Sequence, residues 1–144
     1  MFNSIVWTLL LTICTVGLHI LGTILLVNSL HKQTSYSDHR HWHRSNVLLL
    51  IRIAALLLVL QGLEALLWAL FFLWKGSLPD FEAALYFSLT SYSTIGYGDL
   101  VLPAGVRLVG VMEGLVGTFM SGWSVALLVA LIHNMAQSAK RMPE

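Results

Sequence analysis

Three long apolar runs, separated by polar segments, divide the sequence. They cover residues 5–27, 47–74 and 106–132. A helix needs about 20 apolar residues to cross the hydrocarbon core of a bilayer, so each run is long enough to span it. The second and third runs exceed this minimum, which indicates a tilt or an extension beyond the hydrocarbon. The pattern predicts an all-α integral membrane protein with three transmembrane helices.

A shorter amphipathic segment, residues 80–92, lies between the second and third runs. Asp80 can cap a helix here, and Glu82 favours its first turn. Such a helix is only ~20 Å long, too short to cross a membrane, so we expect a re-entrant helix. The glycine-containing stretch at residues 94–98 should line a water-filled path, because non-helical backbone at membrane depth is tolerated only there or inside protein.

The composition agrees with a membrane protein and argues against other classes. Of the 144 residues, 57% are hydrophobic and 10% are charged, and the mean hydropathy is +0.78. The net charge of +1 and the lack of a large basic block predict no nucleic-acid partner. The single Cys14 allows no disulfide framework. Because the sequence has no evident nucleophile–base pair or phosphate-binding glycine loop, it predicts neither an enzyme nor an organic cofactor.

Basic residues are concentrated in the polar segments that follow the first and third runs. By the positive-inside rule these segments lie in the cytoplasm, so the N-terminus and the glycine stretch lie on the outer side. We therefore expect a multi-pass protein of the plasma membrane, surrounded by lipid, with a cytoplasmic C-terminus. The basic residues that carry this prediction are Lys32, Arg40, Arg44, Lys140 and Arg141.

The stretch at residues 94–99, Thr-Ile-Gly-Tyr-Gly-Asp, places two glycines in a mostly apolar chain. A narrow pore can replace the water around a cation with rings of backbone carbonyl oxygens. To turn successive carbonyls toward one axis, alternate residues must adopt backbone angles that glycine reaches freely. Gly96 and Gly98 therefore indicate a carbonyl-lined pore. One copy cannot surround an ion, so we expect about four chains around a cyclic axis.

This stretch resembles the T-[VI]-G-Y-G-D motif of the potassium-channel pore-loop family and matches it at every position. The chain is similar to the small prokaryotic channels with two pore helices, with one additional N-terminal helix. The resemblance implies a homotetrameric pore architecture. The implied layout has an N-terminal helix and a basic, histidine-rich loop at 1–46, a pore module at 47–134 (outer helix 47–75, pore helix 80–92, filter 94–98, inner helix 105–132) and a short cytoplasmic tail at 135–144.

The resemblance also implies roles for individual residues. Asp99 would accept a hydrogen bond behind the filter from Tyr86, where several relatives have a tryptophan. Thr90 stands where some relatives have a glutamate, and a neutral hydroxyl cannot share a proton with Asp99. The permeant K+ would bind to backbone carbonyls and to the Thr94 hydroxyl. The ion sites would be formed by Thr94, Ile95, Gly96 and Tyr97, with Gly98 completing the filter.

Gly117, Glu64 and Glu113 are the candidates for a role in gating. Gly117 lies closest to the hinge position of related inner helices, although glycines on such helices also allow close packing. Glu64 and Glu113 are carboxyls at similar depth inside apolar runs, where they are costly and face protein or water. They could bond each other or pore-helix hydroxyls such as Ser88 or Ser91, either as structural contacts or as a proton-sensitive gate.

Histidines occur in the first polar loop and in the first apolar run. His39, His41 and His43 alternate, so they would share one side of an extended strand. They could bind a metal, respond to cytoplasmic pH, or belong to a solvated basic loop beside anionic lipid. His19, inside the first run, is interpreted as a buried histidine with satisfied hydrogen bonds.

Three functions are compatible with these patterns. A potassium-selective channel that conducts passively is the favoured one. The alternatives are a weakly selective cation channel of the same fold and a non-conducting membrane accessory subunit. The relative permeability to potassium and sodium separates the first two, and ion flux through the purified chain tests the third.

Overall fold

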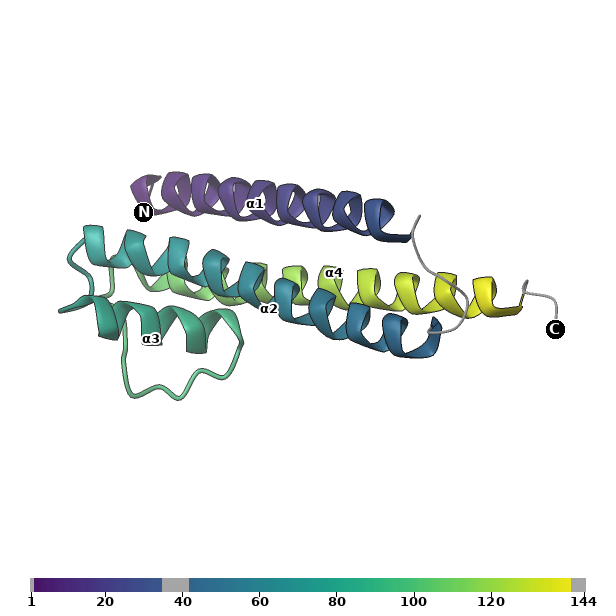
Figure 1. The fold of residues 1–144 in the computed structure, drawn as a ribbon. Coiled ribbons are helices and arrows are strands. Elements are labelled where there is room, and N and C mark those ends of the chain that lie inside the picture. The colour runs from purple at the N-terminus through teal and green to yellow at the C-terminus, as the bar shows by residue number, and fades with distance from the viewer. Residues whose placement is uncertain (1, 35–41, 141–144) are drawn as a thin grey trace.

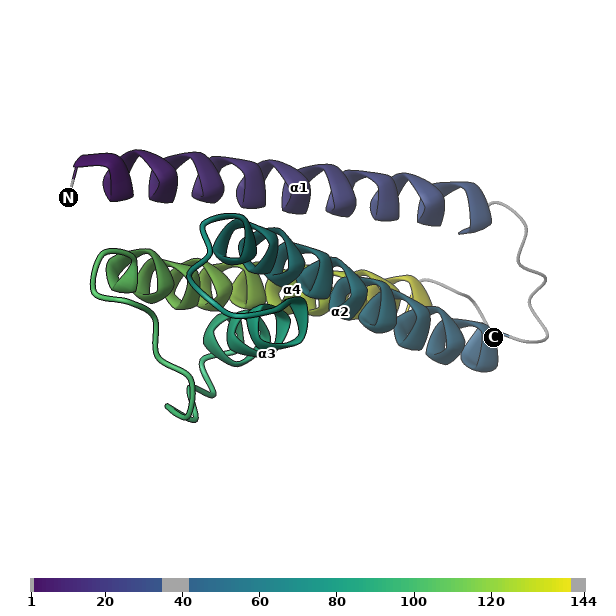
Figure 2. The ribbon, with the colours of Figure 1, turned by 90° about the vertical axis from the view of Figure 1, so that its left-hand side faces the viewer.

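The computed structural model describes residues 2–34 and 42–140 and, within them, the side chains of residues 3–29 and 47–137. These residues form helices joined by loops, without a strand, so the predicted all-α fold class is confirmed for them. α2 and α4 form a middle layer, with the long helix α1 on one side and the short helix α3 on the other (Figures 1 and 2). The helices are α1 (Phe2–Thr34), α2 (Trp42–Trp74), α3 (Phe81–Tyr92) and α4 (Arg107–Lys140).

Three helices of the described residues are long and apolar enough to cross a membrane. α1 and α4 continue past the predicted ends of their apolar runs, and α2 begins before its predicted start. Hydropathy marks only the apolar part of a helix, whereas its backbone hydrogen bonds continue into polar turns, so these helices are longer than their apolar runs. The membrane-capable spans are Asn3–Ser29, Val47–Trp74 and Arg107–Gln137.

Polar side chains define both ends of α3. The Asp80 carboxylate accepts a hydrogen bond from the Ala83 amide at 2.8 Å, which caps the N-terminus as the sequence predicts. At the other end the Ser93 hydroxyl donates to the Leu89 carbonyl at 2.6 Å. α3 ends at Tyr92. From there an irregular loop runs back beside α3 and leads to α4 (Figure 1).

The core lies where α2, α3 and α4 meet. Trp68 and Phe72 of α2 are fully buried, and Val109 and Met120 of α4 pack into the same cluster. The ring of Phe72 lies edge-on to that of Phe87 in α3, with centroids 5.4 Å apart. Lipid tails are as apolar as these side chains, so close packing and buried hydrogen bonds, rather than removal of apolar surface from water, hold the helices together.

Buried hydrogen bonds connect α1 to α2. The Trp68 Nε1–H group donates to Thr15 Oγ1 at 3.0 Å. One turn further along α1, His19 Nδ1 lies 2.8 Å from Glu64 Oε1. Thr15, Trp68, His19 and Glu64 are all fully buried. α1 is therefore packed onto the other helices through polar contacts at membrane depth, where such contacts have no water to replace them.

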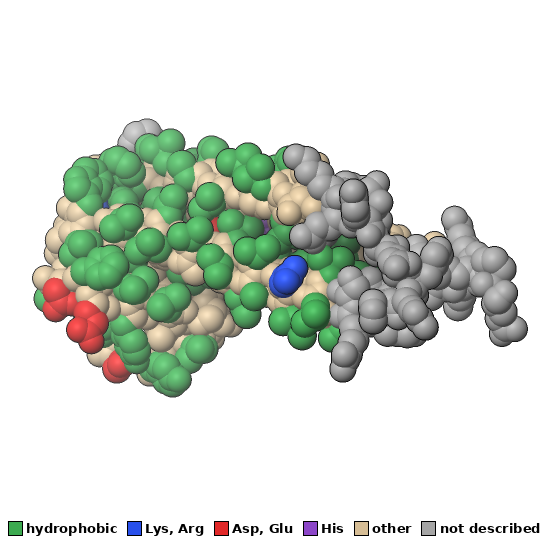
Figure 3. Space-filling model, in the orientation of Figure 1, with side chains coloured by type: hydrophobic (Ala, Val, Ile, Leu, Met, Phe, Trp, Pro, Cys, Tyr) green, Lys and Arg blue, Asp and Glu red, His purple; other side chains and the backbone are tan. Residues whose placement is uncertain are grey.

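The outside of the molecule is mostly apolar, as Figure 3 shows for one face. Among the described residues, the exposed acidic side chains are Asp80, Glu82 and Asp99, and Glu64 and Glu113 are buried. Acidic side chains gather at the end of the molecule that carries α3 (Figure 3). The apolar surface suits contact with lipid along the helices, and the acidic end suits contact with water.

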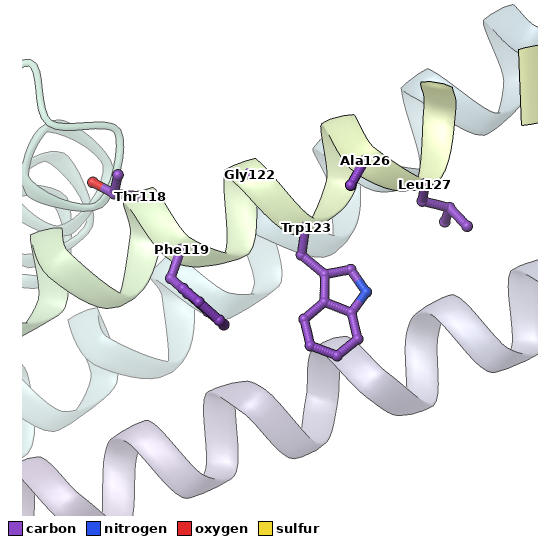
Figure 4. Close-up of a pocket in the computed structure, with 6 residues that line it drawn as sticks. All are labelled: Thr118, Phe119, Gly122, Trp123, Ala126 and Leu127. Atoms are coloured by element: carbon purple, nitrogen blue, oxygen red, sulfur yellow. The ribbon is translucent and has the colours of Figure 1, made fainter. Parts of the chain in front are cut away.

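An apolar groove of about 580 Å³ lies along α4. Phe119 and Trp123 project from α4 toward α1 at this groove (Figure 4). Its lining contains no charged side chain, so it suits a lipid tail better than an ion or a polar ligand. The lining residues are Thr118, Phe119, Gly122, Trp123, Ala126 and Leu127.

Candidate functional site

The loop after α3 has an alternating backbone. The φ angles of Thr94, Gly96 and Gly98 are 62°, 53° and 78°, in the left-handed region that residues with side chains avoid. Among the described residues, Thr94 is the non-glycine residue with a positive φ. A non-glycine residue held there carries a cost on the order of 1–3 kcal/mol and indicates that its surroundings determine its conformation.

Hydrogen bonds from the end of α3 fix the start of this loop. The Thr94 amide donates to the Ser91 carbonyl, and the Gly96 amide donates to the Thr90 carbonyl, both at 3.0 Å. The loop therefore continues directly from the last turn of α3. Any shift of that turn moves Thr94 with it.

The loop is uncovered in a single chain. Residues 93–99 are all exposed. Tyr97 is 70% exposed and Ile95 is 56% exposed, although both side chains are large and hydrophobic. A loop of this composition at membrane depth needs other atoms around it, because exposed backbone polar groups have no partners in hydrocarbon.

Asp99 and Tyr86 form a contact behind the loop. The Tyr86 hydroxyl donates a hydrogen bond to Asp99 Oδ2 at 2.8 Å, which is the pair that the sequence analysis expects. This hydrogen bond raises the pKa of Tyr86 above its ordinary value of 10.0, so the hydroxyl stays protonated and remains a donor at neutral pH. The rings of Tyr86 and Tyr97 are stacked, with centroids 6.5 Å apart and planes at 11°. These contacts connect α3 to both ends of the Tyr97–Asp99 segment.

Thr90 does not reach Asp99. Its hydroxyl donates to the carbonyls of Tyr86 and Phe87, both at 3.0 Å, within its own helix. Such a bond to the preceding turn is the usual one for threonine in a helix. Thr90 therefore supports the loop through its backbone carbonyl, which accepts the bond from Gly96.

The two carboxyls in the apolar runs do not bond each other. The Glu64 carboxyl lies beside His19 and accepts a hydrogen bond from the Tyr92 hydroxyl at 2.5 Å. The Glu113 carboxyl accepts no hydrogen bond from a described residue within the usual limits of distance and angle. The Ser88 hydroxyl lies beside this carboxyl and likewise has no hydrogen-bond partner among the described residues. Of the two predicted arrangements, the bond between the two carboxyls is wrong, because they face different turns of α3. The bond to a pore-helix hydroxyl is present for Glu64, although its donor is Tyr92 and not Ser88 or Ser91.

Gly117 lies in a close helix contact. A Cβ atom added at Gly117 would be 2.1 Å from the carbonyl oxygen of Tyr92. Gly114, one turn earlier, faces the Ser91 carbonyl oxygen at 3.1 Å by the same measure. α4 is one continuous helix through both positions. Of the two predicted roles for Gly117, this structure shows close packing, and the packing is against the last turn of α3.

The histidine loop is only partly described. His43 lies in the first turn of α2, so the prediction that it shares an extended strand with His39 and His41 is wrong for His43. His39 and His41 lie outside the described residues. The described parts of the chain contain no group of His, Cys, Asp or Glu side chains that could hold a metal ion.

Two partners of Glu64 were missed by the sequence analysis. The sequence predicts a buried His19 with satisfied hydrogen bonds but does not name its partner. Its Nδ1 atom lies at hydrogen-bond distance from Glu64, whereas its Nε2 atom has no partner among the described residues. Tyr92 was assigned no role. A signal was present, since Ala84, Ser88 and Tyr92 recur every fourth residue and form the buried face of α3.

A family model described as ion channel matches residues 47–134. The matched segment contains α2 from its membrane-capable part onward, α3, the alternating loop and most of α4. It excludes α1. No curated protein and no solved structure matches the chain. With its all-helical fold and membrane-capable helices, the chain is a multi-pass membrane protein that belongs to the ion channel family.

Proposed function

We propose that the protein is a potassium-selective channel that conducts K+ passively and has no enzymatic role. The observation that carries this proposal is the alternation of positive φ angles at Thr94, Gly96 and Gly98. This alternation lets successive carbonyls turn toward one side, which a row of ion sites requires. Thr94, Ile95, Gly96 and Tyr97 would supply the carbonyl oxygens, and the Thr94 hydroxyl would add a further oxygen.

The exposed loop supports an assembly of about four copies around a common axis. One chain would provide one row of carbonyls, and residues 93–99, which would form it, are exposed. Large apolar side chains also lie exposed every fourth residue along α4, at Val111, Leu115 and Phe119. Neighbouring copies would cover the loop and part of this stripe, and lipid would cover the rest.

We further propose that the loop opens on the outer side of the plasma membrane. The basic segments of the sequence place the C-terminus in the cytoplasm and the N-terminus outside. The exposed carboxylates Asp80, Glu82 and Asp99 would then surround the outer entrance. Negative charge at an entrance raises the local concentration of cations.

The test is a bi-ionic measurement on the purified chain reconstituted alone in liposomes. We expect permeability to K+ to exceed that to Na+ by at least about tenfold, which corresponds to ~1.4 kcal/mol. Equal permeabilities would instead identify a weakly selective cation channel. If the reconstituted chain carried no current, the protein would be an accessory subunit.

A second prediction concerns the contact behind the loop. Tyr86→Phe keeps the ring that stacks on Tyr97 but removes the hydrogen bond to Asp99. The loop should then leave its conducting geometry more readily, and the mean open time of single channels should fall by about fivefold, the effect of ~1 kcal/mol. Tyr86→Trp is the control, because its indole N–H can still donate. Open times that are the same for the phenylalanine variant and the wild type would show that Asp99 needs no donor from α3.

A further inference from the structure

A buried chain of hydrogen bonds connects α1 to the end of α3. His19 of α1 lies 2.8 Å from Glu64 Oε1 of α2, and the Tyr92 hydroxyl donates to Glu64 Oε2 at 2.5 Å. His19 and Glu64 are fully buried and Tyr92 is 4% exposed. We call these three residues the α1–α3 link. It crosses three helices at the depth of the core and involves no water-exposed group.

One member of the link lies outside the family match. The match begins at residue 47, whereas His19 belongs to the additional helix. Glu64 and Tyr92 therefore lie in the pore module, and one of the two groups at hydrogen-bond distance from the Glu64 carboxyl comes from α1. The pore module of this chain thus has a buried carboxyl whose surroundings are complete only when α1 is in place.

A buried carboxyl depends strongly on such partners. Removing one partner of a buried polar group leaves that group unsatisfied, at a cost larger than the net contribution of the bond. Among the described residues, the other groups near the link make no hydrogen bond to Glu64. Trp123 presents its ring edge-on to His19, with centroids 5.9 Å apart, and Thr15 and Thr23 donate to carbonyls of α1 itself.

Tyr92 is held on two sides. Its hydroxyl is bonded to Glu64, and its carbonyl oxygen lies against Gly117 of α4, where no Cβ could fit. Thr94 follows two residues later and is bonded to the Ser91 carbonyl in the same turn. The last turn of α3 therefore carries both the Tyr92 side chain and the carbonyl that holds the start of the alternating loop.

We propose that α1 sets the ion selectivity of the pore through this link. His19 positions Glu64, Glu64 positions Tyr92, and Tyr92 places Thr94 at the inner end of the filter. The three are positioning residues, since none of them touches the permeant ion. This inference rests on the proposed potassium filter, and it gives the additional helix a function in conduction.

The test compares K+ to Na+ permeability ratios of assembled, reconstituted variants. His19→Leu removes the imidazole, and Tyr92→Phe removes the hydroxyl. Each should lower the ratio by about tenfold, an effect of the size expected for losing one hydrogen bond to a buried charged or polar group. The double variant should fall no further than either single one, because both changes break the same link. His19→Asn should retain most of the wild-type ratio, since its amide nitrogen can occupy the place of Nδ1.

Thr15→Val is the matched control. It removes the neighbouring bond from Trp68 on the same face of α1, and this bond involves neither Glu64 nor Tyr92. The ratio should stay at the wild-type value. An equal fall in Thr15→Val would show that any loosening of α1 changes selectivity, and a wild-type ratio in His19→Leu would show that α1 has no influence. Either result would overturn the inference, as would additive losses in the double variant.

The experiment distinguishes a failure of assembly, a failure of the proposed potassium filter and a failure of this inference. If His19→Leu yields no assembled protein, the permeability ratios of Tyr92→Phe and His19→Asn are compared with that of the Thr15→Val control instead. A wild-type ratio in Tyr92→Phe would then reject the link. A wild-type chain with a ratio near one would reject the potassium filter itself and the inference with it. A selective wild type whose Tyr92→Phe variant is equally selective would reject the inference alone.

Discussion

Gly96→Ala is expected to abolish potassium current. Gly96 has a φ of 53°, and a residue with a Cβ atom in this left-handed region is disfavoured by roughly 1–2 kcal/mol. No atom lies within 4 Å of an added Cβ, so the obstacle is the backbone conformation and not a clash within the chain. The alanine backbone would relax toward negative φ and turn a carbonyl away from the axis. The same change would occur in every copy, so the row of ion sites would be broken.

The measurement is K+ flux into liposomes that contain equal amounts of assembled wild-type or variant protein. We expect flux at the background level for Gly96→Ala. Gly105→Ala is the matched control: an added Cβ there also meets nothing within 4 Å, and its φ is not positive. The control should conduct like the wild type. Wild-type flux through the Gly96 variant would mean that the alternating backbone is not the conducting element.

Local features of the sequence predicted the helices and the start of the site well. The Asp80 cap and the length of the short helix depend on neighbouring residues alone, and the structure has both. Likewise, the glycine spacing predicted alternation, and positive φ angles occur at Gly96 and Gly98. The same angle at Thr94 could not be predicted, because threonine avoids it and the bonds to the Ser91 and Thr90 carbonyls that fix the start of the loop form only in the folded chain.

Contacts between helices were much harder to predict. Helices that are apolar on all sides give no periodic signal for which face meets which neighbour. Glu64 and Glu113 have similar depth in the sequence, and depth alone allows either a bond between them or a bond from each to a pore-helix hydroxyl. Their partners depend on how each helix is rotated, and that rotation places Glu64 between His19 and Tyr92 instead. The sequence thus located the costly carboxyls but not the groups that stabilise them.

These contacts change the interpretation of the additional helix. From sequence, α1 was an extra span with no assigned place. In the structure it contributes Thr15 and His19 to the buried polar contacts of α2, and one of these leads through Glu64 to the last turn of α3. The alternating loop is therefore supported from two directions, by α4 at Gly117 and by α1 through Glu64. Both supports act on Tyr92.

Gly117→Ala tests the support from α4 and is expected to prevent normal assembly of the pore. An added Cβ would lie 2.1 Å from the Tyr92 carbonyl oxygen, far inside van der Waals contact, and a backbone atom cannot move aside as a side chain can. α3 and α4 must separate, at a cost of about 1–3 kcal/mol or more in each chain. The melting temperature of the assembled protein in detergent should fall, and the fraction that assembles should fall with it.

Gly122→Ala provides the comparison on the same helix, because an added Cβ there meets nothing within 4 Å. Alanine also has the higher helix propensity, so this variant should be at least as stable as the wild type. Comparing Gly117→Ala with Gly122→Ala also distinguishes the two roles predicted for Gly117, a gating hinge and a close helix contact. If the residue served only as a hinge, Gly117→Ala would change the open probability and leave the melting temperature unchanged. If the melting temperature fell in Gly117→Ala but not in Gly122→Ala, the glycine would instead be needed for the close contact between α4 and the last turn of α3.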